Sequence, residues 1–89
     1  MEITAEILEK KLRDEFQASH VEVIDETTGG CGQKFSTVIV SEKFEGKPLL
    51  QRHRLVNSCL AEELKTIHAF SMKTLTQADW TKRQQQQAS

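Results

Sequence analysis

The side chains best suited to chemistry in this 89-residue sequence are the thiol of Cys31 and the imidazole of His68. Cys31 stands between Gly30 and Gly32, so neighbours without side chains leave its sulfur exposed and let the backbone adjust around a ligand. A tolerated thiol in a variable loop explains Cys31 equally well, because no Cys-x-x-Cys pair accompanies it. For His68, the simpler interpretation is a hydrogen-bonded histidine at the edge of a core.

Enzymatic chemistry has little support elsewhere in the chain. The sequence contains no Gly-x-Ser-x-Gly nucleophile elbow, no Gly-x-Gly-x-x-Gly fingerprint and no Gly-x-x-x-x-Gly-Lys phosphate loop. A pair of Cys31 as nucleophile and His68 as base lacks any visible orienting group or oxyanion donor. We therefore expect a protein that is not an enzyme.

A second group of candidate binding residues lies around a basic segment. The charged residues between positions 42 and 54 are Lys43, Lys47, Arg52, Arg54, Glu42 and Glu45. Their local excess of positive charge suits an acidic protein patch or a small anion such as glutathione, with Lys47, Arg52 and Arg54 as candidate contacts. His53 is a further candidate, although its place in an apolar stripe also suits packing at the core margin. Solvated loop charge explains the same residues.

Composition limits the class of protein. The chain is 37% hydrophobic and 28% charged, and no apolar run approaches the about 20 residues that span a bilayer, so no membrane association is expected. The segment MEITAEILEKKL has neither an apolar core nor an Arg-rich, acid-free character, which favours the cytosol, with the nucleus also open. Cys31 and Cys59 are then expected as free thiols. A net charge of −1 and a pI of about 6.3 are unsuited to neutralising phosphates.

Hydrophobic periodicity and turn residues predict the first half of the fold. A helix covers residues 5–18, with Thr4 as its cap. Alternating and β-branched residues predict strands at 20–25 and 34–41, which pair as an antiparallel hairpin with its tip at 26–33. The second of these strands is expected to be the more central one.

The second half of the chain adds two helices and one strand. A helix begins near Pro48 and is followed by a strand over 66–72, so the two central strands form a right-handed β-α-β unit. The apolar stripe of this helix consists of Leu49, His53, Val56, Leu60 and Leu64. Thr76 caps a last helix, on which Trp80 is expected to cover the core.

These elements predict an α+β domain of order α-β-β-α-β-α, with a three-stranded mixed sheet and helices on one face. A single domain spans residues 1–83, and the Gln-rich segment 84–89 is expected to be a flexible tail. Strand alternation places His68 on the same face as Phe70 and Met72.

Three segments together closely resemble the BolA family: FEGKPLLQRHRLV at 44–56, LAEEL at 60–64 and IHA at 67–69. The resemblance covers residues 3–83 and points to the short cytosolic branch of that family. It implies the class II KH-like form of the α+β fold, in agreement with the order of elements derived above.

The resemblance also implies a partner and a cofactor. Members of the cytosolic branch bind monothiol glutaredoxins and share a glutathione-containing [2Fe–2S] cluster with them. His68 occupies the position of the family's C-terminal ligand histidine, and Cys31 matches the cysteine in the loop between the first two strands. Because a cluster needs four ligands, this chain is expected to hold none alone, and thiolates of glutaredoxin and glutathione complete the set. The implied function is cytosolic iron–sulfur trafficking or assembly and iron homeostasis.

The competing hypothesis is a KH-like nucleic-acid-binding regulator, since some bacterial BolA proteins are regarded as transcription factors. KH domains clamp the nucleic-acid backbone with a Gly-x-x-Gly loop, whereas Gly46-Lys47-Pro48-Leu49 has only one of the glycines. With the acidic balance of the chain, this absence disfavours nucleic acid as a ligand.

Overall fold

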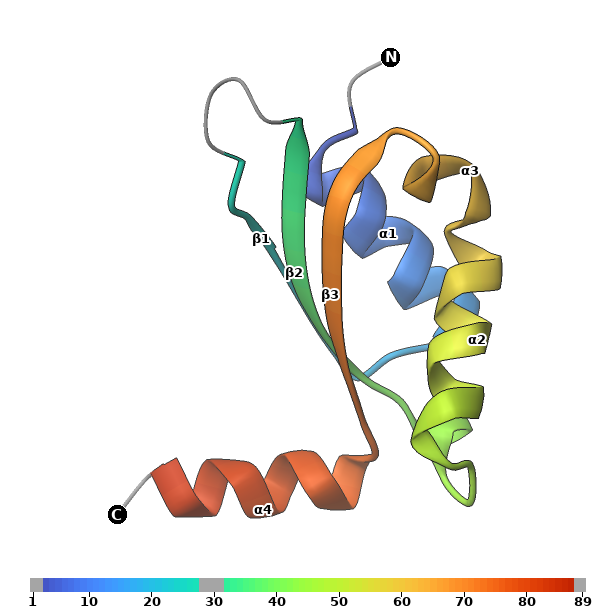
Figure 1. The fold of residues 1–89 in the computed structure, drawn as a ribbon. Coiled ribbons are helices and arrows are strands. Elements are labelled where there is room, and N and C mark those ends of the chain that lie inside the picture. The colour runs from blue at the N-terminus through green and yellow to red at the C-terminus, as the bar shows by residue number, and fades with distance from the viewer. Residues whose placement is uncertain (1–2, 28–31, 88–89) are drawn as a thin grey trace.

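The computed structural model describes residues 3–27 and 32–87. The elements are α1 (Ala5–Phe16), β1 (His20–Asp25), β2 (Gln33–Val40), α2 (Leu49–Cys59), α3 (Ala61–Leu64), β3 (Ile67–Leu75) and α4 (Gln77–Gln87). One turn of 3₁₀ helix, Glu42–Phe44, precedes α2. The predicted order α-β-β-α-β-α is confirmed, with the second helix divided into α2 and α3 (Figure 1).

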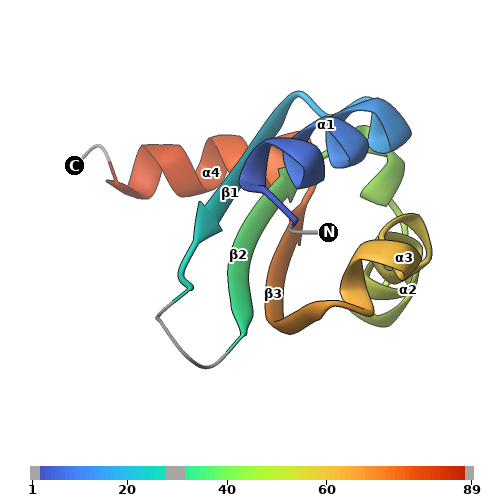
Figure 2. The same ribbon diagram turned by 90° about the horizontal axis from the view of Figure 1, so that it is seen from above.

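The three strands form one mixed sheet in the order β1-β2-β3. β1 pairs antiparallel with β2, and β2 pairs parallel with β3, which confirms both the hairpin and the β-α-β crossover. Figures 1 and 2 show α1, α2 and α3 on one face of the sheet, whereas α4 leaves the end of β3 and runs away from them. The predicted two-layer α+β fold is confirmed, and α4 is the helix that departs from the shared face.

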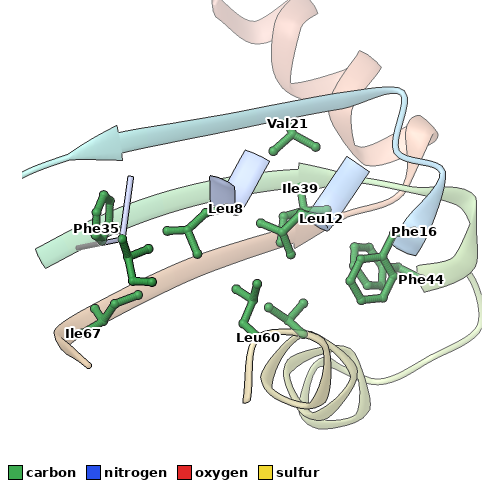
Figure 3. Packing of buried hydrophobic residues seen from close by; sticks show 11 residues of the cluster. Leu8, Leu12, Phe16, Val21, Phe35, Ile39, Phe44, Leu60 and Ile67 are labelled. Carbon is green, nitrogen blue, oxygen red and sulfur yellow. The ribbon is translucent and has the colours of Figure 1, made fainter. Parts of the chain in front are cut away.

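The core lies between the sheet and the helices α1 and α2. Leu8, Leu12 and Phe16 recur at helical spacing and form the buried face of α1. Figure 3 shows them packed with Val21, Phe35, Ile39, Phe44, Leu60 and Ile67. Because burying each such side chain is worth about 1.5–3 kcal/mol, this cluster fixes the helices on one face of the sheet.

Local hydrogen bonds explain where α1 begins and ends. The hydroxyl of Thr4 accepts a hydrogen bond from the N–H of Ile7 at 3.2 Å, as expected of an N-cap. Gln17 has φ 49°, a left-handed conformation that ends the helix at Phe16, before the predicted residue 18. Ser41 Oγ donates to the carbonyl oxygen of Phe16 at 2.7 Å and so ties the end of α1 to the end of β2.

The predicted apolar stripe of the second helix is only partly buried. Val56 and Leu60 are fully buried, but Leu49 is 59% exposed. In Figure 1 the first turn of α2 lies beyond the end of α1, so the buried part of the stripe begins further along the helix. The prediction that Leu49 faces the core is therefore wrong. Helical spacing shows which residues share one face of a helix, but it does not show how far the elements packed against that face extend.

The start of α4 follows the predicted capping pattern. Thr76 Oγ1 accepts a hydrogen bond from the N–H of Asp79 at 3.2 Å, and Asp79 Oδ2 accepts one from the N–H of Thr76 at 3.3 Å. The helix continues to Gln87, which lies inside the segment predicted as a flexible tail. No helix of the described chain has the length and apolar character needed to cross a bilayer.

Trp80 packs on β1 and does not cover the main core. Its ring stacks on the imidazole of His20, with centroids 4.4 Å apart and an interplanar angle of 21°. Because alternate strand residues point to opposite faces, His20 lies on the side of the sheet opposite the buried Val21. Trp80 therefore covers one end of the helix-free face, which corrects the prediction made for it.

Candidate metal-binding site

β3 begins with an irregularity in its pairing that determines the position of His68. Gln33 of β2 lies opposite Ile67, and the next residue, Lys34, lies opposite Ala69. His68 is thus one extra residue in β3, a β-bulge. Bulges of this kind redirect a side chain and are found next to functional sites more often than chance predicts.

The bulge changes which side chains share a face. Ile67 is 9% exposed and Phe70 packs against the same core cluster, although three positions separate them. In an uninterrupted strand these two side chains would point to opposite faces. His68 is exposed, so the predicted face shared by His68, Phe70 and Met72 is wrong. The apolar pair Ile67 and Phe70, which are three positions apart, was the available signal for a bulge.

The backbone at Gly32 passes directly against His68. Gly32 has φ +81°, and a Cβ built on it would lie 2.9 Å from the Cβ of His68 and 4.0 Å from its Nδ1. Only a residue without a side chain fits this approach without a shift of the loop or of the histidine. The sequence indicated Gly32 only as a neighbour of Cys31, and its close approach to His68 was not predicted.

Cys31, the predicted partner of His68, lies outside the described residues. It is bonded directly to Gly32, whose backbone contacts the histidine. Within residues 3–27 and 32–87, no group of three or more His, Cys, Asp or Glu side chains is arranged to hold a metal ion. Of the two predicted ligands, the structure therefore places His68 alone.

The strand ends that carry the loop are held by hydrogen bonds. Thr27 N–H donates to Asp25 Oδ1 at 2.9 Å, and Lys34 N–H donates to Thr27 Oγ1 at 3.1 Å. The hydroxyl and the N–H of Thr27 lower the pKa of the Asp25 carboxyl by hydrogen bonding to its charged form. These contacts hold the ends of β1 and β2 together on the two sides of residues 28–31.

The side-chain amide of Gln33 ties the start of β2 to the backbone of Ile3, which precedes α1. Gln33 Nε2 donates to the carbonyl oxygen of Ile3 at 2.5 Å, and Gln33 Oε1 accepts from the N–H of Ile3 at 3.2 Å. Gln33 is the residue opposite Ile67 and follows Gly32 in the chain. The segment before α1 thereby braces the strand that faces His68, a contact that no local sequence pattern predicted.

The four other candidate residues, Lys47, Arg52, His53 and Arg54, do not lie with His68. Arg52 is turned inward, with its Nε donating to the carbonyl oxygen of Lys47 at 2.8 Å and its Nη1 to that of Thr74 at 3.0 Å. Thr74 and His68 lie at opposite ends of β3, about 20 Å apart at a strand rise of about 3.3 Å per residue. These residues and His68 therefore form two separate regions.

Cys59, the other cysteine, is a free thiol in the described structure. Its sulfur lies 3.9 Å from the carbonyl oxygen of Lys11 and is half-buried between α1 and α2. Burial raises the pKa of the Cys59 thiol, and the nearby charge of Glu15 adds to that effect. Cys59 is thus poorly suited to act as a thiolate ligand.

Comparison with known proteins identifies relatives across almost the whole chain. BolA-like protein 2 of Mus musculus is 57% identical over 86 residues, covering 97% of this chain and 100% of the mouse protein. BolA-like protein 2 of Homo sapiens is 58% identical over 85 residues, covering 96% and 99%. The Escherichia coli protein named DNA-binding transcriptional regulator BolA is 42% identical over 81 residues, covering 84% and 77%.

A solved structure has the same fold. The crystal structure of a bol-like protein from Babesia bovis superposes with a TM-score of 0.86 at 44% sequence identity, covering 94% of this chain and 96% of that one. The family profile described as BolA-like protein matches residues 12–79. This match spans β1, β2, β3, α2 and the His68 bulge, and the chain therefore belongs to the BolA family.

Proposed function

We propose that this chain is a non-enzymatic iron–sulfur partner protein. It binds a monothiol glutaredoxin in the cytosol, and also in the nucleus, and shares a glutathione-containing [2Fe–2S] cluster with it. The role is iron–sulfur trafficking or assembly and iron homeostasis. The observation that carries the proposal is the exposed imidazole of His68, set on a bulge and packed against the backbone next to Cys31.

The chemistry of the site fits such a cluster. Thiolate and imidazole are both ligands of [2Fe–2S] centres, and His68 is accessible to a second protein. The bulge and the contact with Gly32 restrict the imidazole, so less conformational freedom is lost when its nitrogen binds iron. An imidazole in place of one thiolate leaves the cluster less negative and tends to raise its potential.

The number of available ligands favours a shared cluster. His68 and Cys31 together supply at most two of the four ligands that a [2Fe–2S] cluster requires. The sulfur of Cys59 lies against the carbonyl oxygen of Lys11 on α1, and the raised pKa of its thiol disfavours ligation. A glutaredoxin thiolate and a glutathione thiolate would complete the set.

The proposal is tested by mixing the purified chain with cluster-loaded monothiol glutaredoxin and glutathione without oxygen. Visible absorption and circular dichroism are recorded for the native chain, His68→Ala and His53→Ala. A new spectrum that requires His68 and tolerates loss of His53 supports a shared, histidine-ligated cluster. No complex and no spectral change with the native chain would contradict the proposal.

A second function is favoured by one specific observation. The Escherichia coli relative is named a DNA-binding transcriptional regulator. In this chain, Gly46 lies in the loop before α2 with φ +74°, but Leu49 stands where the second glycine of a KH clamp would be. Duplex DNA binding that weakens with salt and distinguishes between sequences would support the regulator and count against a purely iron–sulfur role.

A further inference from the structure

Two adjacent leucines at the start of α2 are the most exposed large apolar side chains in the described parts of the chain. Leu49 is 59% exposed and Leu50 is 62% exposed. Single exposed apolar residues are common on protein surfaces. Two neighbours in one helical turn, next to the exposed Pro48, instead form a small apolar surface. Neither leucine belongs to the core cluster, so the fold does not require them to be apolar.

Positive charge lies beside the two leucines. Arg54 is exposed and lies one turn after Leu50 on the same side of α2. Lys47 precedes the helix, and its ammonium group donates to the carbonyl oxygen of Lys43 at 2.8 Å. Residues 42–54 carry four basic and two acidic side chains in a chain of net charge −1. We name Lys47, Leu49, Leu50 and Arg54 the α2 tip.

The helix terminus adds to this positive character. Pro48 is the N-cap of α2 and supplies no side-chain hydrogen bond to the N–H groups of the first turn. These uncapped groups carry the partial positive charge of an 11-residue helix. An acidic partner would therefore meet two basic side chains and a helix N-terminus around an apolar centre.

Hydrogen bonds of Arg52 hold the α2 tip against the rest of the fold. The guanidinium of Arg52 is bonded to the carbonyl oxygens of Lys47 and Thr74, and it lies 3.9 Å from Asp79 Oδ2. This joins the loop before α2 to the end of β3 and to α4. A surface fixed in this way loses little freedom when a partner binds.

We propose that the α2 tip docks an acidic segment of a partner protein, whose apolar side chains cover Leu49 and Leu50 and whose carboxylates face Lys47 and Arg54. His68 lies near the start of β3. The α2 tip lies near the other end of that strand, where Arg52 of α2 donates to the carbonyl oxygen of Thr74. This second interface is therefore separate from the proposed cluster site, and both can be occupied in one complex.

The test uses a defined probe, a synthetic peptide in which leucine and phenylalanine alternate with glutamate and aspartate. One control peptide carries lysine in place of the acids, and another carries serine in place of the apolar residues. Binding is followed by peptide fluorescence anisotropy and by amide chemical shifts of the full chain.

The variants of the chain are the double substitution Leu49→Ser with Leu50→Ser, and the single substitution Arg54→Glu. Their matched controls are Ile24→Ser, at a residue 56% exposed, and Lys65→Glu, which has the same charge change.

The expected result is saturable binding of the acidic peptide only, with shifts centred on residues 47–54. The leucine variant weakens binding by about tenfold or more, whereas Ile24→Ser and Lys65→Glu leave it unchanged. His68→Ala also leaves it unchanged, which separates this inference from the proposed cluster function. Three results would overturn the inference. The acidic peptide shows no saturable binding, the chemical-shift changes spread over other surfaces, or the leucine variant binds the peptide as tightly as the native chain. Leucine-dependent binding to phosphatidylserine vesicles without peptide binding would overturn it in favour of a membrane surface.

Discussion

The backbone of Gly32 lies so close to His68 that a Cβ on Gly32 would stand 2.9 Å from the Cβ of the histidine. Real Cβ atoms do not tolerate so short a contact, so the loop or His68 must move when Gly32 gains a side chain. We predict that Gly32→Ala alters the visible circular dichroism of the shared cluster. It should also destabilise the fold by about 1–2 kcal/mol, because φ +81° is unfavourable for alanine.

The chain contains a matched control for this prediction. Gly46 has φ +74°, and a Cβ there would meet nothing within 4 Å. Gly46→Ala should therefore cost only the backbone strain of a positive φ in urea denaturation, without the clash at Gly32, and leave the cluster spectrum unchanged. Equal effects of the two substitutions on the spectrum would mean that the contact between Gly32 and His68 does not position the ligand.

Arg52 is predicted to act in stability and not at the cluster. Arg52→Gln removes charged hydrogen bonds to the carbonyl oxygens of Lys47 and Thr74, and we expect a loss of about 2–3 kcal/mol in the free energy of unfolding. Arg52→Lys should not restore it, because an ammonium group lacks the planar fork that reaches both oxygens. Thermal denaturation checks this, with the exposed Arg54→Gln as control. An unstable Arg54→Gln together with a stable Arg52→Gln would contradict it.

The ion pair between Lys11 and Glu63 should make stability depend on pH. Lys11 Nζ lies 2.8 Å from Glu63 Oε2, and this contact lowers the pKa of Glu63 and raises the pKa of Lys11. For Glu63, the stabilisation is present above its ordinary pKa of 4.5 and is lost as pH falls through the lower folded-state pKa. For Lys11, it is present below 10.5 and is lost as pH rises through the raised value.

We therefore expect Glu63→Gln to lower the urea midpoint at neutral pH and to have little effect in acid. Glu62→Gln is the control, since Glu62 makes only an exposed contact with Lys65 at 3.4 Å. A midpoint difference between the native chain and Glu63→Gln that stays constant from neutral pH into acid would rule out this pair as the source of the dependence.

The stacking of Trp80 on His20 predicts a spectroscopic signature for α4. Trp80 is the only tryptophan of the chain, so its fluorescence reports on this helix alone. His20→Ala should shift Trp80 emission to longer wavelength, because the ring loses its stacking partner and gains water. His53→Ala, a substitution on α2, should leave the emission unchanged. An unshifted emission in His20→Ala would mean that the stack does not hold Trp80.

Sequence periodicity was sufficient where an element is defined by its own residues. The alternation in residues 20–25 predicted β1, and Thr4 and Thr76 were correctly predicted as caps because capping depends on side chains within one turn. The order of elements and the resemblance in residues 44–56 then led to the family.

The errors arose where distant parts of the chain decide the outcome. Leu49 has the spacing of a core residue, but α1 does not extend far enough to cover it. Trp80 was predicted to cover the core, but it stacks on His20 of β1. The bulge at His68 depends on how β3 pairs with β2, which spacing along one strand does not reveal. At the candidate site, the sequence singled out His68, whose role as a ligand stays a prediction, whereas its contact with Gly32 required the fold.

The central claim is that an imidazole nitrogen of His68 binds iron in the shared cluster. The most direct measurement is pulsed electron paramagnetic resonance of the reduced complex, prepared with this chain labelled with ¹⁵N at histidine and with unlabelled glutaredoxin. The account predicts a strong ¹⁵N hyperfine coupling that is present in the native chain and in His53→Ala and absent in His68→Ala. A reduced cluster with no coupling to histidine nitrogen, or with coupling that survives His68→Ala, would contradict it.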